Sequence, residues 1–465
     1  MQDNSNIHTS NTLQVFWVAL GGLSSLGLSI ISAAILSRYF DKAEYGTYKQ
    51  ILYVYTTLLV IFSAGLPRVY AYFLPRYSLE EGKAIVWKIS KVLFIAGALF
   101  SMFLFLFSGY IADILKNEEL EYGLKVFSPM PMLLLPTLGI EGIFSTYKKA
   151  LFIAIYNTLS RILMLIFIVV PIIIFKADYV FAIYGWLIAS FITLIMANFF
   201  KGIPFKGIES KVTTLKYREI FSYSLPLVYA SLWGISIKAA DEFYISRFFG
   251  AKVFAEFSNG FIELPFVTMI TASTSLVLMP IFSKVFHENK GIEELLITWR
   301  KALNKSAIII YPLVVYFITY SSEIMLVLYS YKYKESSVYF QVNMILNFFN
   351  IIIFAPLFLS MGKTKLYARI HMVIAIFAWV SGYVIILVFN SPLSIAINST
   401  AISICKILYF TYLSSRLLKI GYFELFPVKS LSLLVFHSVI VAVIVKFIEV
   451  RFLLLNSLIM NLIIT

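Results

Sequence analysis

Ionisable side chains lie inside long apolar stretches of this sequence, where a charge is costly. They are Arg68, Glu141, Arg161, Lys238, Asp241, Glu242, Glu263, Lys406 and His437. A charged group at the centre of a membrane-spanning helix costs roughly 3 kcal/mol on insertion scales unless it faces a water-filled cavity or a partner. Buried cations of this kind bind anionic ligands, and buried carboxylates bind cations or protons. These residues are therefore the first candidates for a functional site, except Glu141, which we expect to snorkel or pair, and His437, which we expect to pack uncharged in a peripheral helix.

The cations of the N-terminal half are accompanied by other polar residues. Asn157, Ser160 and Arg161 are spaced by three and four positions, so a helix places them on one face. Arg161 has no acidic residue three or four positions away. Arg68 follows Gly65-Leu66-Pro67, a sequence that predicts a kink in its helix. We expect Arg161 and Asn157 to line a solvated interior, and Arg68 either to join them or to snorkel toward the helix end.

The C-terminal half repeats this pattern. Ser399, Ser403 and Lys406 form a similar polar stripe, and Lys406 has no acidic neighbour at helical spacing. Positive charge in both halves favours an anionic ligand. In a membrane, a lipid phosphate or diphosphate that carries sugars is such a ligand. The alternative for each cation is a purely structural role.

An acidic group accompanies Lys238. Asp241 and Glu242 follow Lys238 at three and four positions, and Glu263 lies in the next apolar segment. If the three carboxylates lie close together, they could share a proton or a Na⁺ ion and couple function to an ion gradient. Charge balance with Lys238 and Arg247 is the alternative. Lys238 itself either contacts a ligand or neutralises its neighbours.

Composition places the chain in a membrane. Of its 465 residues, 60% are hydrophobic and 13% are charged, with a mean hydropathy of +0.88. Soluble domains are about 25% charged. We therefore predict an all-α polytopic membrane protein. The single cysteine, Cys405, excludes a disulfide framework within the chain and a multi-cysteine metal site, so we expect no metal.

Thirteen apolar segments are long enough to cross a bilayer, because about 20 helical residues span its core. They are 12–36, 50–74, 89–111, 126–146, 150–175, 179–200, 220–246, 254–283, 302–321, 337–361, 366–389, 392–417 and 424–448. A last run, 452–465, has 14 residues and is either a short fourteenth span or an interfacial helix. The loops hold more Lys and Arg on one side, which predicts a cytoplasmic N-terminus. The formal charge of +14 then reflects topology and anionic lipids, and no nucleic-acid partner is expected.

Two short stretches reveal an internal repeat. Ser37-Arg38-Tyr39-Phe40 and Ser246-Arg247-Phe248-Phe249 each lie in the turn between the first two helices of a six-helix unit. We therefore predict two six-helix bundles arranged as parallel repeats. The expected parts are an N-terminal lobe (1–200), a cytoplasmic inter-lobe loop (201–219), a C-terminal lobe (220–418) and a C-terminal extension with helix 13 and a short possible helix 14 (419–465).

The chain resembles the bacterial O-antigen and polysaccharide flippases (Wzx-like proteins). These belong to an exporter superfamily that also contains the multidrug-and-toxin extruders (MATE proteins) and the lipid II flippase. The similar motifs run from Leu36-Ser37-Arg38-Tyr39-Phe40 and Glu44-Tyr45-Gly46-Thr47-Tyr48, through Ser224-Leu225-Pro226-Leu227 and Asp241 before Ser246-Arg247-Phe248-Phe249-Gly250, to Met361-Gly362-Lys363-Thr364. In the second half, Phe254-Ala255-Glu256-Phe257 departs from the pattern Tyr45-Gly46-Thr47-Tyr48.

The resemblance implies a MATE-like fold and a function. Such a protein would move undecaprenyl-diphosphate-linked oligosaccharide, an O-antigen or capsule repeat unit, to the periplasmic leaflet of the bacterial inner membrane by alternating access. Arg161, Lys406, Arg68, Lys238 and Asn157 would then contact substrate, and Asp241, Glu242 and Glu263 would couple an ion. Membrane lipids, a glycan polymerase and chain-length machinery are the partners that the resemblance implies.

Other function classes remain open from the sequence. Membrane glycan polymerases and ligases generally share a large periplasmic loop that bears their catalytic residues. The topology predicted for this chain has no such loop. A drug/cation antiporter of the same fold would need an acidic cavity, and a non-transporting assembly scaffold is a third alternative. Gly362-Lys363-Thr364 resembles the end of a phosphate-binding loop, but the position of its first glycine is Leu357. We therefore expect neither catalytic residues nor a nucleotide cofactor. The energy would then come from an ion gradient, from the membrane potential or from removal of the substrate, with H⁺ or Na⁺ as the candidate coupling ion.

Overall fold

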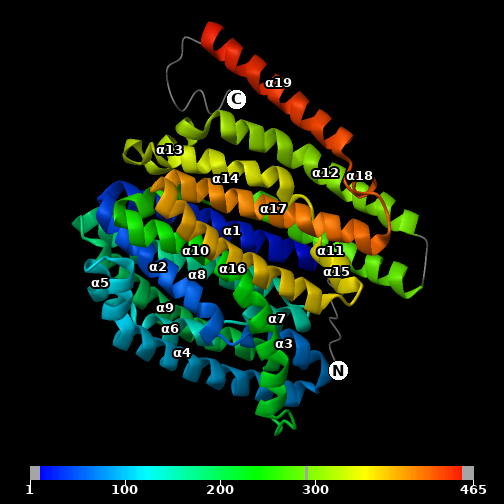
Figure 1. Cartoon of the computed structure of the whole chain (residues 1–465). Helices are drawn as coiled ribbons and strands as arrows, with labels where there is room; N and C mark the ends of the chain where they lie inside the picture. The colour runs from blue at the N-terminus through cyan, green and yellow to red at the C-terminus, as the bar shows by residue number, and fades with distance from the viewer. Residues whose placement is uncertain (1–10, 289–291, 453–465) are drawn as a thin grey trace. The chain divides into compact units, whose positions relative to one another are not determined.

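The computed structural model describes residues 11–288 and 292–452, and all regular secondary structure within these ranges is helical (Figure 1). The chain divides into two compact units, Met1–Ile235 and Ser236–Thr465. The division falls inside the long helix α10 (Tyr217–Gly260). Each unit is described by itself.

Unit 1 is a bundle of long helices joined by shorter ones. Its elements are α1 (Asn11–Tyr39), α2 (Lys42–Phe62), α3 (Leu66–Phe73), η1 (Leu74–Arg76), α4 (Leu79–Leu115), α5 (Glu119–Phe127), α6 (Met130–Leu134), η2 (Leu135–Thr137), α7 (Ile140–Thr146), α8 (Ala150–Phe175), α9 (Tyr179–Gly202), η3 (Ile203–Phe205) and the first part of α10. Helix α8 packs against both α1 and α9. A Cβ on Gly185 of α9 would lie 1.9 Å from the Phe167 carbonyl oxygen, so the absence of a side chain permits this close approach.

The second predicted span is bent, as the sequence predicts. Helices α2 and α3 meet at an angle of 44°. Gly65 forms the bend with a φ of +67°, a left-handed conformation that favours glycine. A Cβ at this position would approach the Ser224 carbonyl oxygen to 2.9 Å. Gly65 is therefore required both by the backbone turn and by its close contact with α10.

The two Ser-Arg-aromatic-Phe turns of the repeat are built differently. In the first, Asp41 caps α2: its carboxylate accepts hydrogen bonds from the backbone N–H groups of Ala43 and Glu44, and Glu44 accepts one from the N–H of Asp41. In the second, Gly250 interrupts α10 with a φ of +77°. The second turn, which is followed by Phe254-Ala255-Glu256-Phe257 in place of the first-half pattern, thus also has a different backbone conformation.

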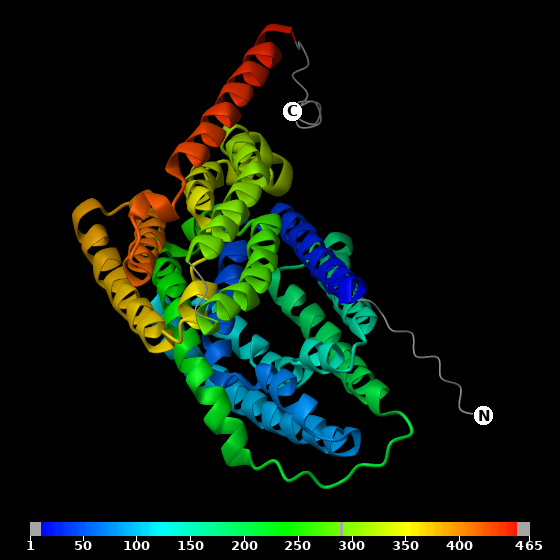
Figure 2. The same ribbon diagram turned by 90° about the vertical axis from the view of Figure 1, so that its right-hand side faces the viewer.

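An extended strap, residues 206–216, leads from η3 to α10 and is visible in Figure 2. Two contacts hold it against α4: Lys83 Nζ donates to the Ile208 carbonyl oxygen at 2.6 Å, and the Lys211 N–H donates to the Glu80 carbonyl oxygen. Leu215 is fully buried in the core of unit 1. The strap is therefore attached to unit 1 at Ile208, Lys211 and Leu215, whereas most of its other side chains are exposed.

Unit 2 contains the remainder of α10 and the elements that follow it. They are α11 (Pro265–His287), α12 (Ile292–Thr319), α13 (Ser321–Tyr329), η4 (Tyr331–Tyr333), α14 (Ser336–Asn350), α15 (Ala355–Ser360), α16 (Thr364–Phe389), α17 (Pro392–Leu418), α18 (Tyr422–Leu425) and α19 (Val428–Phe452). Helix α19 runs beside α12 (Figures 1 and 2). Lys446 of α19 forms an ion pair with Glu323 of α13 at 3.4 Å. Glu449, which pairs with Lys446 on the same helix at 3.3 Å, accepts a hydrogen bond from Tyr320 at 2.9 Å. These contacts hold α19 at the junction of α12 and α13.

Within the described residues, eleven helices are long and apolar enough to cross a membrane, or twelve if the bent pair α2–α3 counts as one span. The predicted tenth span, 337–361, is wrong as a single helix because it breaks between α14 and α15. Pro356 lacks an N–H, and its ring would clash with the Ile352 carbonyl in a continuous helix. The prediction for 452–465 falls outside the described residues except at Phe452.

Candidate functional site

A cavity of about 410 Å³ lies within unit 1, between α1, α2 and α8. Side chains near the break at η2 and one from α9 complete its wall. Its polar and aromatic lining consists of Ser29, Ser32, Tyr45, Tyr48, Lys49, Tyr55, Thr56, Thr137, Arg161 and Trp186. The cavity therefore combines two cations with hydroxyl groups and aromatic rings, and no carboxylate lines it.

Arg161 is the central cation of this wall. Its Nε donates a hydrogen bond to Ser25 Oγ at 2.8 Å, and Nη1 lies 3.9 Å from Met164 Sδ. Among residues 11–288 and 292–452, no carboxylate lies within ion-pair distance of its guanidinium. A guanidinium has five N–H donors, so most of them are available to an anion. The structure thus places Arg161 on the wall of a cavity within unit 1, and its role as a substrate contact stays a prediction.

Lys49 is the second cation, and the sequence analysis missed it. We predicted that the second span begins at residue 50, which left Lys49 in a loop. In the structure α2 begins at Lys42, and Lys49 Nζ lies 5.3 Å from the centre of the Tyr45 ring. The spacing of Tyr45, Tyr48, Lys49 and Tyr55 repeats with helical period. That period was the signal that would have found it.

The aromatic residues make the cavity amphipathic. Tyr48 packs on Trp186, with ring centres 6.4 Å apart. Tyr45 is fully buried, and Tyr48 and Tyr55 are nearly so. Tyrosine and tryptophan offer an apolar face together with a polar group. Such a surface suits a ligand that has apolar ring faces and many hydroxyl groups, while the cations suit its negative charge.

Two other predicted contacts of unit 1 lie elsewhere. Asn157 Nδ2 donates to Glu141 Oε1 at 3.0 Å and does not line the cavity. Arg68 is exposed on α3, one turn after the bend at Gly65. The polar stripe of α8 therefore divides, because Arg161 faces the cavity while Asn157 joins α8 to α7.

The three carboxylates of the predicted acidic group in unit 2 have different environments. Asp241 is buried, and its carboxylate accepts a hydrogen bond from Ser399 of α17. Glu263 is exposed and forms an ion pair with Lys238 at 3.1 Å. Glu242 is half-buried beside them on α10. Lys238 thus pairs with a carboxylate of the following segment, and Asp241 joins α10 to α17.

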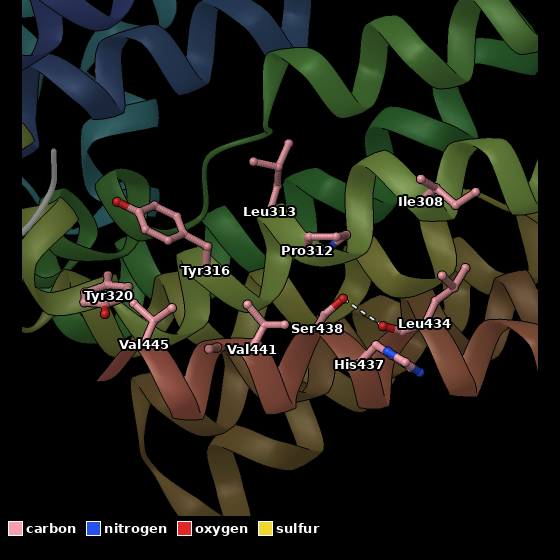
Figure 3. Close-up of a pocket in the computed structure, with 11 residues that line it drawn as sticks. Ile308, Pro312, Leu313, Tyr316, Tyr320, Leu434, His437, Ser438, Val441 and Val445 are labelled. Atoms are coloured by element: carbon pink, nitrogen blue, oxygen red, sulfur yellow. Dashed lines mark hydrogen bonds between the residues drawn. The ribbon is translucent and has the colours of Figure 1, made fainter. Parts of the chain in front are cut away.

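The predicted stripe of α17 also divides. Ser399 faces Asp241, whereas Lys406 lines a groove of about 500 Å³ between α16 and α17. A further groove, of about 570 Å³, lies between α12 and α19 and includes Pro312, Tyr316 and His437 (Figure 3). No Lys, Arg, Asp or Glu lines this second groove. In the described part of the chain, no group of three or more His, Cys, Asp or Glu side chains is arranged to hold a metal ion.

Lys201 is a second cation, after Lys49, that the sequence analysis placed in a loop. Helix α9 continues to Gly202, and Lys201 is fully buried. Its Nζ donates to Ser90 Oγ at 2.9 Å and to the Pro136 carbonyl oxygen at 2.5 Å, and it lies 5.4 Å from the centre of the Tyr70 ring. Lys201 thus ties α9 to α3, α4 and the break at η2.

Comparison with known proteins identifies the family. The family model described as "Polysaccharide biosynthesis protein" matches residues 13–286, more than half of the chain. The chain belongs to this family. A search of curated proteins gave no match.

Solved structures show which fold this member of the polysaccharide biosynthesis family has. The lipid II flippase MurJ in an inward closed conformation is similar with a TM-score of 0.72 and 13% identity, over 97% of this chain and 96% of that one. The Vibrio cholerae MATE transporter VcmN gives 0.62 and 11% identity, over 89% of this chain and 97% of that one. A MOP superfamily transporter from Pyrococcus furiosus gives 0.62 and 14% identity, over 87% and 94%. The predicted MATE-like fold is confirmed.

The electrostatic character of the unit 1 cavity can be measured without knowing its ligand. In a Cys405→Ser background, we divide each rate by the rate of the same reagent with free cysteine. On this scale we expect Ser29→Cys to react about tenfold faster with anionic sulfonatoethyl methanethiosulfonate than with its cationic trimethylammonium analogue, because Arg161 and Lys49 concentrate anions. Adding Arg161→Ala should reduce this ratio. Ser37→Cys, buried on the same helix, is the unreactive control. Faster reaction with the cationic reagent would contradict a cationic cavity.

Proposed function

We propose that this protein flips a polyprenyl-diphosphate-linked oligosaccharide, an O-antigen or capsule repeat unit, from the cytoplasmic to the periplasmic leaflet of the bacterial inner membrane. Its family and its fold, which is that of a lipid II flippase and of MATE transporters, support this proposal. A cytoplasmic N-terminus and exchange of the product with a glycan polymerase and chain-length machinery belong to the same proposal.

The observation that carries the proposal is the cavity around Arg161 and Lys49. A diphosphate cannot enter hydrocarbon unaccompanied, because an unpaired charge in a low-dielectric medium is strongly disfavoured. Arg161 has no described carboxylate partner that would compete with an incoming phosphate. Charge-assisted hydrogen bonds from a guanidinium to phosphate oxygens are short and about twice as strong as neutral ones.

The other parts of the cavity fit the remainder of such a substrate. The rings of Tyr48 and Trp186 offer faces for sugars, and Ser29, Ser32 and Thr56 offer hydroxyl groups. Alternating access by the two units would then expose this polar surface to each leaflet in turn. Lys406, Arg68, Lys238 and Asn157 remain proposed contacts for the substrate at other stages.

The sidedness of the lipid-linked glycan in cells tests this function. Without the protein, we expect repeat units to accumulate on the inner leaflet, out of reach of a periplasmic glycosidase. Wild type should restore access, whereas Arg161→Ala should lower the export rate at least tenfold, the size expected for losing a charge-assisted contact. Arg218→Ala, an exposed arginine of the same unit, is the matched control.

Two outcomes would overturn the assignment. If single repeat units reach the periplasm without the protein but long polymer is missing, the protein acts as a polymerase or ligase. If Arg161→Ala supports full export at a normal protein level, the cavity does not carry the substrate.

Asp241 is the proposed ion-coupling residue that the structure favours among the three carboxylates. It is buried and hydrogen-bonded to Ser399, whereas Glu263 is exposed and paired with Lys238. Asp241→Asn keeps an acceptor for Ser399 but cannot gain or lose a proton. We expect it to remove the dependence of export on the H⁺ or Na⁺ gradient, and Glu263→Gln to retain it. Unchanged gradient dependence in Asp241→Asn, and also after adding Glu242→Gln, would place coupling elsewhere.

A further inference from the structure

The groove between α16 and α17 carries two cations, whereas the grooves beside α19 carry either no charged residue or Lys446, which pairs with carboxylates. Its walls include Val373, Ile374, Phe377, Ala401 and Ile402, and both Arg369 and Lys406 line it. Arg369 is exposed and Lys406 is half-buried. The groove thus combines an apolar channel with two cations, which is the surface that an anionic amphiphile requires.

Neither cation is engaged by the protein. Among the described residues, the side chains of Arg369 and Lys406 form no hydrogen bond or ion pair. A cation that is not paired within an apolar helix pair is expected to meet a ligand or water. The contrast with Lys238 and Lys446, which both pair with carboxylates, shows that unit 2 neutralises other cations internally.

The two cations lie at different depths. Helices α16 and α17 are joined by a two-residue turn at Asn390 and Ser391, so they are antiparallel and their other ends lie on the same side. At about 1.5 Å per residue, Arg369 lies about 8 Å from the Thr364 end of α16 and Lys406 about 18 Å from the Leu418 end of α17. Arg369 is therefore close to headgroup level, whereas Lys406 is close to the middle of the membrane.

This depth decides between two anionic lipids. The phosphate of a resident phospholipid stays at the edge of the hydrocarbon core, about 15 Å from its middle. Arg369 can reach that level, but Lys406 lies too deep for it. The two cations stand at successive depths below the membrane surface. They therefore suit an anionic headgroup that moves away from the surface while its hydrocarbon chain stays in the apolar groove. A diphosphate also has two charged groups for two cations.

We propose that the α16–α17 groove binds the polyprenyl diphosphate part of the transported lipid, with phosphates at Arg369 and Lys406 and the prenyl chain along Val373, Phe377 and Ala401. The groove takes the diphosphate from headgroup level toward the middle of the membrane. This inference rests on the proposed function and adds to it a second binding site, in unit 2.

The single cysteine of the chain provides a reporter, because Cys405 lines this groove and is exposed. Purified full-length protein in detergent would be treated with N-ethylmaleimide, and Cys405 labelling followed by intact mass. We expect geranylgeranyl diphosphate to slow labelling at concentrations about tenfold or more below those needed for uncharged geranylgeraniol. Phosphatidylglycerol should protect no better than the alcohol.

Charge-removing variants test the two cations separately. Arg369→Gln and Lys406→Gln should each raise the half-protecting concentration of geranylgeranyl diphosphate about tenfold. Lys365→Gln, which removes an exposed charge from the same helix outside the groove, should leave it unchanged. The wild-type comparison of diphosphate with alcohol needs no variant, so the test does not depend on variant folding.

Three results would overturn the inference: no protection by the diphosphate, equal protection by the alcohol, or equal protection by phosphatidylglycerol, which would mark a resident-lipid site. Failure of the proposed function is distinguishable. If the protein translocates the glycolipid but the diphosphate does not protect Cys405, only the groove site is refuted. If the diphosphate protects Cys405 but no glycolipid is translocated, the groove binds a prenyl diphosphate in a protein with a different function.

Discussion

The cost of holding charge inside apolar helices is the constraint on which this structure depends. The chain meets it in three ways. Lys238 and Lys446 pair with carboxylates. Lys201 is buried among uncharged groups of three other elements: it donates hydrogen bonds to Ser90 and to the Pro136 carbonyl oxygen, and it lies over the ring of Tyr70. Arg161 lies on the wall of a cavity, where water or a ligand must provide what the protein does not. This third solution, which Lys406 shares in the α16–α17 groove, leaves a cation able to bind an anion.

Irregular backbone accompanies the polar interior. The break at η2 turns the Pro136 carbonyl toward Lys201, and Thr137 of the same break lines the cavity of Arg161. Non-helical backbone at membrane depth is tolerated where it is buried in protein or lines a wet cavity. The break at η2 is thus part of the way in which unit 1 accommodates its buried cations.

Sequence reasoning predicted the long helices well, because apolar length alone identifies them; the predicted span 150–175 coincides with α8. It also predicted the bend at Gly65. The role predicted for Arg161 stays a prediction. It misplaced Lys49 and Lys201, because α2 and α9 extend beyond their apolar windows into charged residues. The partner of a charged side chain is determined by how segments that are distant in the sequence pack together. The pairs Lys238–Glu263 and Asp241–Ser399 therefore could not be read from spacing along one helix.

Charge-selective translocation by the purified protein is the measurement that tests the central claim most directly. Vesicles containing the full chain would receive one fluorescent polyprenyl-linked disaccharide in three forms, with a diphosphate, a monophosphate or a neutral linkage. If the cations of the unit 1 cavity carry the substrate, the diphosphate form crosses fastest, and the variant with both Lys49→Ala and Arg161→Ala loses that preference. Equal crossing of all three forms, or an unchanged preference in the double variant, would contradict the account.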